Sequence, residues 1–368
     1  MPFYPTINSA STSRAVTSTF LGYDHNPKIA DGEWYDETNL SSSAYPLLSQ
    51  RGKRAVVKTL TAPAGMTGKG NAAGSEGSEH PIGAYADGSK LVFNGAEYDL
   101  GLDSTEKQLI SMGAYILVFP DKKYLNTADL TDYGNMEASF LSTGNVTYTI
   151  CTDTGDAAEY ENMIVSSTAP ESPANGAYWL DTSGSTHALK VYSSSSAMWT
   201  SVATVYVKIS HTGIGAAFSV YDGVTISGAA ADTEQTSSLQ SQISALNKTC
   251  VVYAKGDDYL VVVGLLDKVY TQTAGTVNVT RDVPDMDFVT ESGNRIWGCK
   301  YGLADGKAVN EIYASKLGDF KNWNCFMGLS TDSYSASRGS DGVFTGAVTY
   351  GGYPLFFKEN CIEKVYPS

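Results

Sequence analysis

The sequence predicts an all-β fold, in which β-propeller-like blades carry a small β domain inserted between them. Two observations support this prediction. Tyr occurs 24 times and Gly 36 times while charged residues make up 17% of the chain, a composition that favours short strands and turns over helices. Short segments that alternate with period two also recur along the chain, and Gly-containing turn signals separate them.

The clearest strand pattern lies within residues 293–323. Residues 294–301 and 310–315 alternate large residues with small or polar ones, and Asp305-Gly306 lies between them, which predicts a hairpin. A polar turn at residues 317–320 follows, and Trp323 comes directly after it. We expect Trp323 to pack under the hairpin, because an aromatic plug of this kind commonly completes a propeller blade.

Several short motifs lie between about residues 280 and 366: Asn294-Arg295-Ile296-Trp297-Gly298, Glu311-Ile312-Tyr313-Ala314-Ser315, Leu317-Gly318-Asp319, Asn322-Trp323, Phe344-Thr345-Gly346 and Leu355-Phe356-Phe357-Lys358-Glu359. This set resembles the β-propeller virion proteins of tailed bacteriophages and prophages, in particular those related to the tail hub, or nozzle, of short-tailed phages. The resemblance is dense over this region and weaker over residues 20–54 and 82–127.

The resemblance implies a structural virion protein in the tail hub, or in another portal-proximal part of the head-to-tail region. It implies a ring oligomer, with six copies as the expected number, that contacts other phage tail or connector proteins. DNA would pass through its lumen during ejection without specific binding. The implied location is the virion tail, after synthesis in the host bacterial cytoplasm.

Residues 1–60 are expected to form an N-terminal arm and the first propeller segment. A basic trio near the end of this part, Arg51, Lys53 and Arg54, is a candidate contact with a neighbouring subunit or with DNA. The alternative interpretation of the trio is a solvated turn. Residues 61–80 contain five glycines, which predicts a flexible loop.

Residues 81–127 are expected to form one propeller blade. Strand-like segments occur at 82–85, 90–93, 96–100, 108–112 and 115–119. Asp87-Gly88 and Asn94-Gly95 separate the first three of them and supply the positive φ angles of tight hairpins. Further blades, with the last one incomplete, are expected over residues 250–368.

Residues 128–249 interrupt the blade pattern, which predicts one or two inserted β domains. Leu239, Ile243 and Leu246 have helical spacing within this region and predict one short helix. The border could also lie as late as Leu266, if residues 205–264 form a compact barrel.

Four aromatic residues of the insert, Tyr178, Trp179, Tyr192 and Trp199, suggest an alternative function. Aromatic faces stack on sugar rings, so the insert could be a carbohydrate-binding module that recognises a host surface glycan. The competing interpretation is that these side chains form the core of a small sheet with little else to bury.

The formal net charge of −14 argues against general nucleic-acid binding, which requires a concentrated basic surface. We expect no enzyme, cofactor or metal site. The histidines His25, His80, His187 and His211 lie in separate segments, and Asp282, Asp285 and Asp287 lack the ligand spacing of a calcium loop. No apolar run is long enough to span a bilayer.

Overall fold

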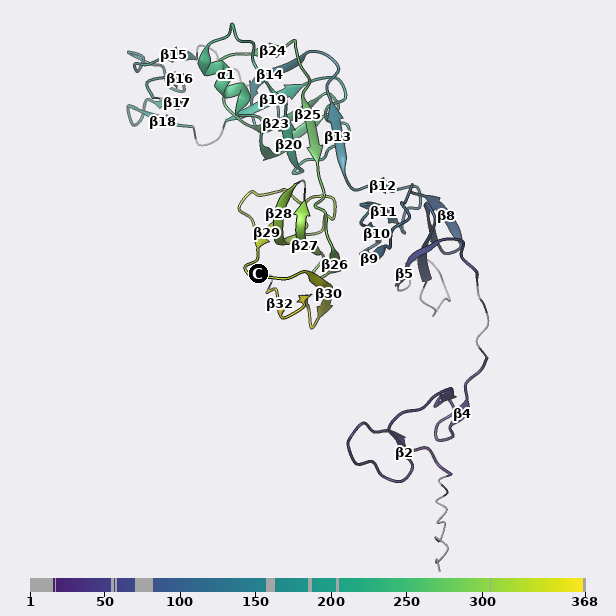
Figure 1. The fold of residues 1–368 in the computed structure, drawn as a ribbon. Coiled ribbons are helices and arrows are strands. Elements are labelled where there is room, and N and C mark those ends of the chain that lie inside the picture. The colour runs from purple at the N-terminus through teal and green to yellow at the C-terminus, as the bar shows by residue number, and fades with distance from the viewer. Residues whose placement is uncertain are drawn as a thin grey trace, which may run out of the picture. The chain divides into compact units, whose positions relative to one another are not determined.

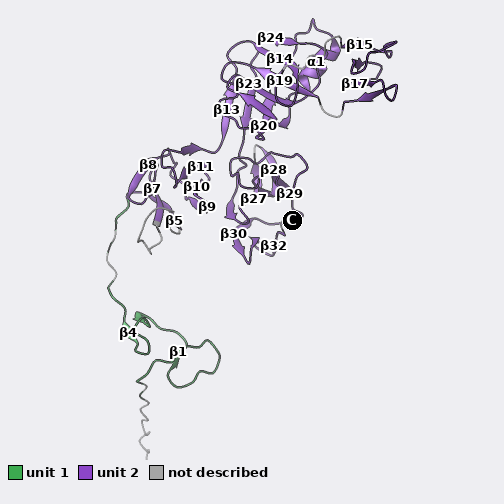
Figure 2. Ribbon diagram, turned by 180° about the vertical axis from the view of Figure 1, so that it is seen from behind, with its two compact units in different colours: residues 1–60 green, residues 61–368 purple. Residues whose placement is uncertain are grey.

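The part of the chain that the computed structural model describes is mostly β, with one short helix and many small antiparallel sheets (Figure 1). The described residues are 16, 18–53, 56, 58–69, 82–156, 163–184, 187–202, 205–304 and 306–366. The chain divides into two compact units, residues 1–60 and 61–368 (Figure 2).

The first unit contains two pairs of very short strands. They are β1 (Gly22–Tyr23) with β2 (Glu33–Trp34), and β3 (Leu40–Ser41) with β4 (Ser49–Gln50). Phe20 is its one buried large apolar side chain among the described residues, whereas Tyr35, Tyr45 and Leu47 are exposed. This unit therefore buries little apolar surface of its own.

The second unit contains four sheets in which consecutive strands pair antiparallel. Sheet 1 consists of β5 (Pro63–Lys69), β6 (Ile82–Asp87), β7 (Lys90–Phe93) and β8 (Ala96–Asp99). Sheet 2 consists of β9 (Gln108–Met112), β10 (Tyr115–Phe119), β11 (Lys123–Asn126) and β12 (Tyr133–Asn135). Sheet 3 consists of β26 (Phe288–Glu291), β27 (Ile296–Ala304), β28 (Lys307–Ala314) and β29 (Tyr334–Ser337). Sheet 4 consists of β30 (Phe344–Tyr350), β31 (Tyr353–Lys358) and β32 (Ile362–Lys364).

These four sheets pack face to face in chain order. Alternate residues of a strand point to opposite faces of its sheet, so one strand can contribute to the core on each side. In β10, Ile116 and Val118 lie in the core shared with sheet 1, and Leu117 and Phe119 lie in the core shared with sheet 3. Sheet 3 is likewise covered on both faces, since Trp297 and its neighbours form a further core with Phe344 and Phe356 of sheet 4. Three apolar cores thus join the four sheets.

An aromatic plug between β28 and β29 fills the core between sheets 2 and 3. The Phe320 ring lies 4.8 Å from that of Tyr115 and 5.3 Å from that of Tyr124. Trp323 is 3% exposed, and its Nε1 donates a hydrogen bond to the Phe320 carbonyl at 2.8 Å. The predicted hairpin at 294–315 and the burial of Trp323 are both confirmed.

An inserted unit lies between sheets 2 and 3 in the sequence. One of its sheets has the order β13–β25–β20–β21 and the other β22–β23–β19–β14–β24, and the two share one core. The strands are β13 (Ala138–Leu141), β14 (Val146–Cys151), β19 (Tyr206–Ser210), β20 (Gly223–Ser227), β21 (Thr249–Val251), β22 (Ala254–Gly256), β23 (Tyr259–Val263), β24 (Tyr270–Gln272) and β25 (Asn278–Arg281).

The predicted helix is present in this inserted unit as α1 (Ser237–Ser244). The side chain of Thr236 caps it by accepting a hydrogen bond from the Leu239 N–H at 3.3 Å. Leu239, Ile243 and Leu246, whose spacing predicted the helix, are all buried in the core of the unit.

A second insertion is nested inside the first, between β14 and β19. It forms a separate four-stranded sheet in the order β15–β16–β17–β18. Its strands are β15 (Ile164–Ser166), β16 (Tyr178–Asp181), β17 (Ala188–Ser193) and β18 (Met198–Ser201), and β15 pairs parallel with β16.

Three expected boundaries differ from the strand pairing. The sequence predicts an insertion over 128–249, with an alternative border as late as Leu266; in the structure β13 pairs with β25 and β23 pairs with β19, so the inserted unit spans 138–281. The period-two pattern of residues 250–281 identifies strands without identifying their partners.

The other two differences concern the first two sheets. Within the expected loop at 61–80, residues 63–69 form β5 and pair with β6, while residues 70–81 lie outside the described residues. The segment 81–127, expected as one blade, contributes to two sheets instead, because β8 ends sheet 1 and β9 begins sheet 2.

We predict that Trp323→Ala lowers the free energy of unfolding by about 3–5 kcal/mol, because it leaves a cavity between sheets 2 and 3. Chemical denaturation measures the loss. Leu303→Ala is the control: Leu303 is 70% exposed, so the change should stay within about 0.5 kcal/mol. Equal effects of the two substitutions would contradict the role of the plug.

Candidate functional site

The four aromatic residues singled out in the insert all lie in the nested sheet. Trp179, Tyr192 and Trp199 share one face of it, whereas Tyr178 pairs with Val191 on the opposite face. The rings of Trp179 and Trp199 are 5.4 Å apart, and those of Tyr192 and Trp199 are 5.3 Å apart. Trp179 is 6% exposed and its Nε1 donates to the Ser166 carbonyl at 2.9 Å, while Tyr178, Tyr192 and Trp199 are half-buried. A buried ring offers no face to a sugar, so Trp179 acts as core.

The basic trio is described in part. Arg51 and Lys53 are exposed, and Arg51 Nη2 donates to Asn39 Oδ1 at 3.4 Å. Arg54 lies outside the described residues. Two exposed cations two residues apart fit a solvated turn as well as a subunit contact.

The histidines remain apart, and His80 lies outside the described residues. His187 lies near Ser238 and Asp267, a combination that resembles a hydrolytic triad. In such a triad the aspartate and the serine hydrogen-bond to opposite nitrogens of the imidazole. Here Ser238 Oγ and Asp267 Oδ1 lie 3.1 Å and 3.4 Å from the same atom, His187 Nδ1, and the serine hydroxyl donates to Asp267 at 2.6 Å. This geometry does not activate the serine.

The acidic residues near Pro284 have separate partners. Lys122 pairs with Asp285 at 2.8 Å, and Lys300 pairs with Asp287 at 2.7 Å. Asp282 accepts a hydrogen bond from the Thr280 hydroxyl at 2.8 Å. Within the described ranges, no three or more His, Cys, Asp or Glu side chains form a group that could hold a metal ion.

A buried polar joint connects the inserted unit to sheet 3; we define it as Asp222, Gly223, Arg281 and Asn322. Arg281 Nη1 lies 2.5 Å from Asp222 Oδ2, and both side chains are buried. Asn322 Nδ2 donates to the Tyr221 carbonyl at 2.7 Å, and Asn322 Oδ1 accepts from the Gly223 N–H at 3.0 Å. A Cβ at Gly223 would lie 2.1 Å from the backbone of Asn324, so only glycine fits here.

The turn that carries Asn322 holds two further charged groups beside the joint. Burial raises the pKa of the Asp319 carboxyl, and the hydrogen bond from the Lys321 N–H offsets this only in part. Burial also lowers the pKa of Lys321, whose Nζ lies 3.8 Å from the centre of the Tyr124 ring. Neither the joint nor these groups were found from the sequence, because their partners lie far apart along the chain.

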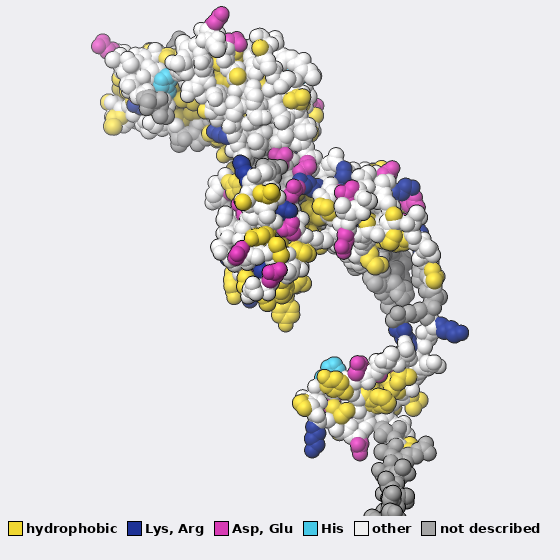
Figure 3. All heavy atoms as spheres, in the orientation of Figure 1, with side chains coloured by type: hydrophobic (Ala, Val, Ile, Leu, Met, Phe, Trp, Pro, Cys, Tyr) yellow, Lys and Arg dark blue, Asp and Glu magenta, His cyan; other side chains and the backbone are white. Residues whose placement is uncertain are grey.

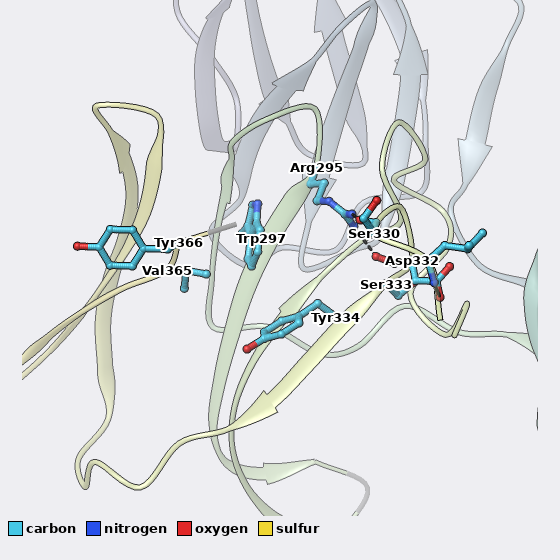
Figure 4. Close-up of a pocket in the computed structure, with 9 residues that line it drawn as sticks. Arg295, Trp297, Ser330, Asp332, Ser333, Tyr334, Val365 and Tyr366 are labelled. Carbon is cyan, nitrogen blue, oxygen red and sulfur yellow. Dashed lines mark hydrogen bonds between the residues drawn. The ribbon is translucent and has the colours of Figure 1, made fainter. Parts of the chain in front are cut away.

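A pocket of about 200 Å³ lies beside sheet 3 (Figure 4). Trp297, Tyr334 and Tyr366 supply its aromatic lining. Its Arg295 guanidinium donates to the carbonyls of Ser315, Ser330 and Asp332, at 2.7, 2.5 and 2.5 Å.

The polar groups of this pocket are occupied by the fold itself. Asp332 Oδ2 accepts from the backbone N–H groups of Gly328 and Leu329 at 2.7 and 3.0 Å. The hydrogen bonds of Arg295 and Asp332 therefore hold the 315–332 segment against β27. The two side chains present no acid–base pair to a substrate.

No family model matches this sequence, and no curated protein matches it significantly. In the described part of the chain, no helix has both the length and the apolar character needed to cross a membrane.

We predict that Trp179→Ala unfolds the nested sheet, since a sheet of this size depends on each large core side chain. Limited proteolysis should cleave the variant within residues 163–202 at least about tenfold faster than the wild type. Trp199→Ala, which removes a half-buried ring, is the matched control and should have a smaller effect. Unchanged resistance in Trp179→Ala would refute its role as core.

We also predict a pH-dependent effect of Asp319→Asn. Because the folded state raises the pKa of Asp319, the native protein binds a proton more tightly there than the unfolded chain, and the contribution of Asp319 to stability falls as pH rises from 3.8 through the raised value. Asp319→Asn should therefore be more stable than the wild type at pH 7, with the difference shrinking on acidification.

Urea unfolding at several pH values measures this difference. Asp341→Asn is the control of opposite sign, because hydrogen bonds from the Gly342 N–H and the Tyr301 hydroxyl lower the pKa of Asp341. A stability difference for Asp319→Asn that grows on acidification would contradict the prediction.

Proposed function

We propose that this protein is a structural virion component of a tailed bacteriophage or prophage, in the tail hub, or nozzle, or the head-to-tail region through which DNA passes. In this proposal sheets 1 to 4 are blades of a β-propeller. The observation that carries it is the face-to-face packing of consecutive antiparallel sheets in chain order, which is how propeller blades pack.

The motifs that resemble tail-hub proteins support the proposal through the structural work of their residues. Trp297 lies in the core between sheets 3 and 4, and Trp323 lies in the core between sheets 2 and 3. Asn322 belongs to the joint that holds the inserted unit. The resemblance therefore concentrates on residues that build a rigid scaffold rather than on a reactive centre.

The proposed mechanism is mechanical. Copies of the protein form a ring, with six as the expected number, and contact other tail or connector proteins. A net charge of −14 disfavours adhesion to DNA phosphates, so a channel bearing this charge would let DNA slide through. The inserted unit would lie on the outside of such a ring.

Electron microscopy of purified virions tests the location. An antibody raised against residues 138–281 should label the tail vertex, and the purified protein with its neighbouring tail proteins should form rings. Particles that contain no copy of the protein would overturn the proposal. A matched antibody against the host's major cytoplasmic protein controls for adhering contaminants.

A further inference from the structure

Sheet 4 has one covered and one uncovered face. Phe344 and Phe356 are buried against sheet 3. Paired residues of adjacent strands lie on the same face of a sheet, and the pairs on the other face are Val348 with Leu355, Phe357 with Ile362, and Tyr350 with Tyr353. We call this set, with Tyr366, whose ring centre lies 5.2 Å from that of Tyr353, the outer face of sheet 4.

The outer face of sheet 4 is apolar and exposed. Tyr350 is 77% exposed and Ile362 is 60% exposed, and Figure 3 shows hydrophobic side chains gathered over this sheet. Lys364 is the charged residue in its paired rows, with Nζ 3.9 Å from the centre of the Tyr353 ring. The equivalent face of sheet 2 is covered by sheet 3, and that of sheet 3 is covered by sheet 4. An exposed apolar face such as that of sheet 4 marks an interaction site.

At the opposite end of the stack, part of the outer face of sheet 1 lacks side chains. On sheet 1, Ala84 and Ala86 face sheet 2, so Gly83 and Tyr85 lie on the other face. Gly83 pairs with Gly68, and a Cβ at either position would meet no atom within 4 Å. Next to this open surface, Met66 is 80% exposed.

The two ends are complementary in shape and in charge. The flat glycine surface of sheet 1 can receive the large side chains of sheet 4, as large and small residues interdigitate in packed cores. The outer face of sheet 1 also carries three carboxylates, Asp87, Glu97 and Asp99, and one cation, Lys90, so its net charge is negative. Lys364 supplies a positive charge on the outer face of sheet 4.

We propose that the outer face of sheet 4 binds the outer face of sheet 1 of a second copy of this chain. The contact continues the packing order that already joins sheets 1, 2, 3 and 4. Within one chain Tyr350 and Ile362 on sheet 4 are exposed, so the chain's own sheet 1 does not cover sheet 4. On sheet 1 the paired glycines Gly68 and Gly83 are exposed, whereas Val92 in the neighbouring row is buried. A head-to-tail contact of this kind generates a ring when the rotation closes. In that respect the inference rests on the proposed function, and it names the surfaces that would form the ring.

Analytical ultracentrifugation of the full chain over a range of concentrations tests self-association. Tyr350→Glu and Gly83→Trp, one at each end, should each weaken association at least about tenfold. Met198→Glu is the matched control, because Met198 is 63% exposed on the nested sheet and should have no effect. Circular dichroism and thermal unfolding verify that each variant folds. A wild type that stays monomeric, or a Tyr350→Glu variant that associates normally, would overturn the inference.

Cross-linking tests which surfaces meet. In a background with both half-buried cysteines replaced, Cys250→Ser and Cys361→Ser, the single variants Gly83→Cys and Ile362→Cys are mixed and treated with a short bis-maleimide. A dimer that contains one copy of each supports the head-to-tail contact. A dimer from Ile362→Cys alone would show that two copies of sheet 4 meet, and an intramolecular link in the double variant at high dilution would show closure within one chain; either overturns the inference.

The two proposals fail in different ways. Label at the tail vertex together with unaffected association of Tyr350→Glu would leave the virion location standing and refute this contact. Head-to-tail cross-links in a protein that is missing from the particle would refute the location and leave the contact standing.

Discussion

The pairing of β13 with β25 is the constraint on which the sheet stack depends. Sheet 2 ends at Asn135 and sheet 3 begins at Phe288, so the two sheets that share the aromatic plug are far apart in sequence. Ala138 pairs with Arg281, which returns the chain to the point where it left. Closing a loop of this length costs on the order of 4 kcal/mol of chain entropy, and the strand pair with the core of the inserted unit offsets that cost.

The buried joint sets how the inserted unit is oriented about the β13–β25 strand pair. A buried ion pair is weak as a source of stability, because the loss of hydration largely cancels the attraction. Its geometry is nevertheless restrictive. Arg281 Nη2 also donates to the Met136 carbonyl at 3.1 Å, so one guanidinium touches the start of the insertion, its end, and Asp222 in the middle. The joint therefore selects one arrangement of the unit from those that the strand pair alone allows.

Local signals in the sequence predicted the strands, and distant partners set their grouping. The segments 90–93, 108–112 and 115–119 match β7, β9 and β10 because tight turns bound them, and Asn94 and Gly95 have the positive φ angles that such turns require. The strands after residue 250 look the same in sequence as those of the stack. They join the inserted unit only because β19 and β14 present matching edges, and no local pattern records that match.

The same closure occurs twice in this chain. The nested sheet leaves the inserted unit after Cys151 and returns at Tyr206, and these two residues pair across β14 and β19. The first insertion begins and ends on its own paired strands β13 and β25, and the nested insertion begins and ends on the paired strands β14 and β19 of the unit that carries it. In both cases the two ends stay adjacent whatever lies between them. Apolar contacts inside the nested sheet, such as Trp179 with Trp199, then stabilise that sheet by itself. Because the ends of each insertion are fixed in this way, its exposed surface can change without altering the packing of the sheets beneath it.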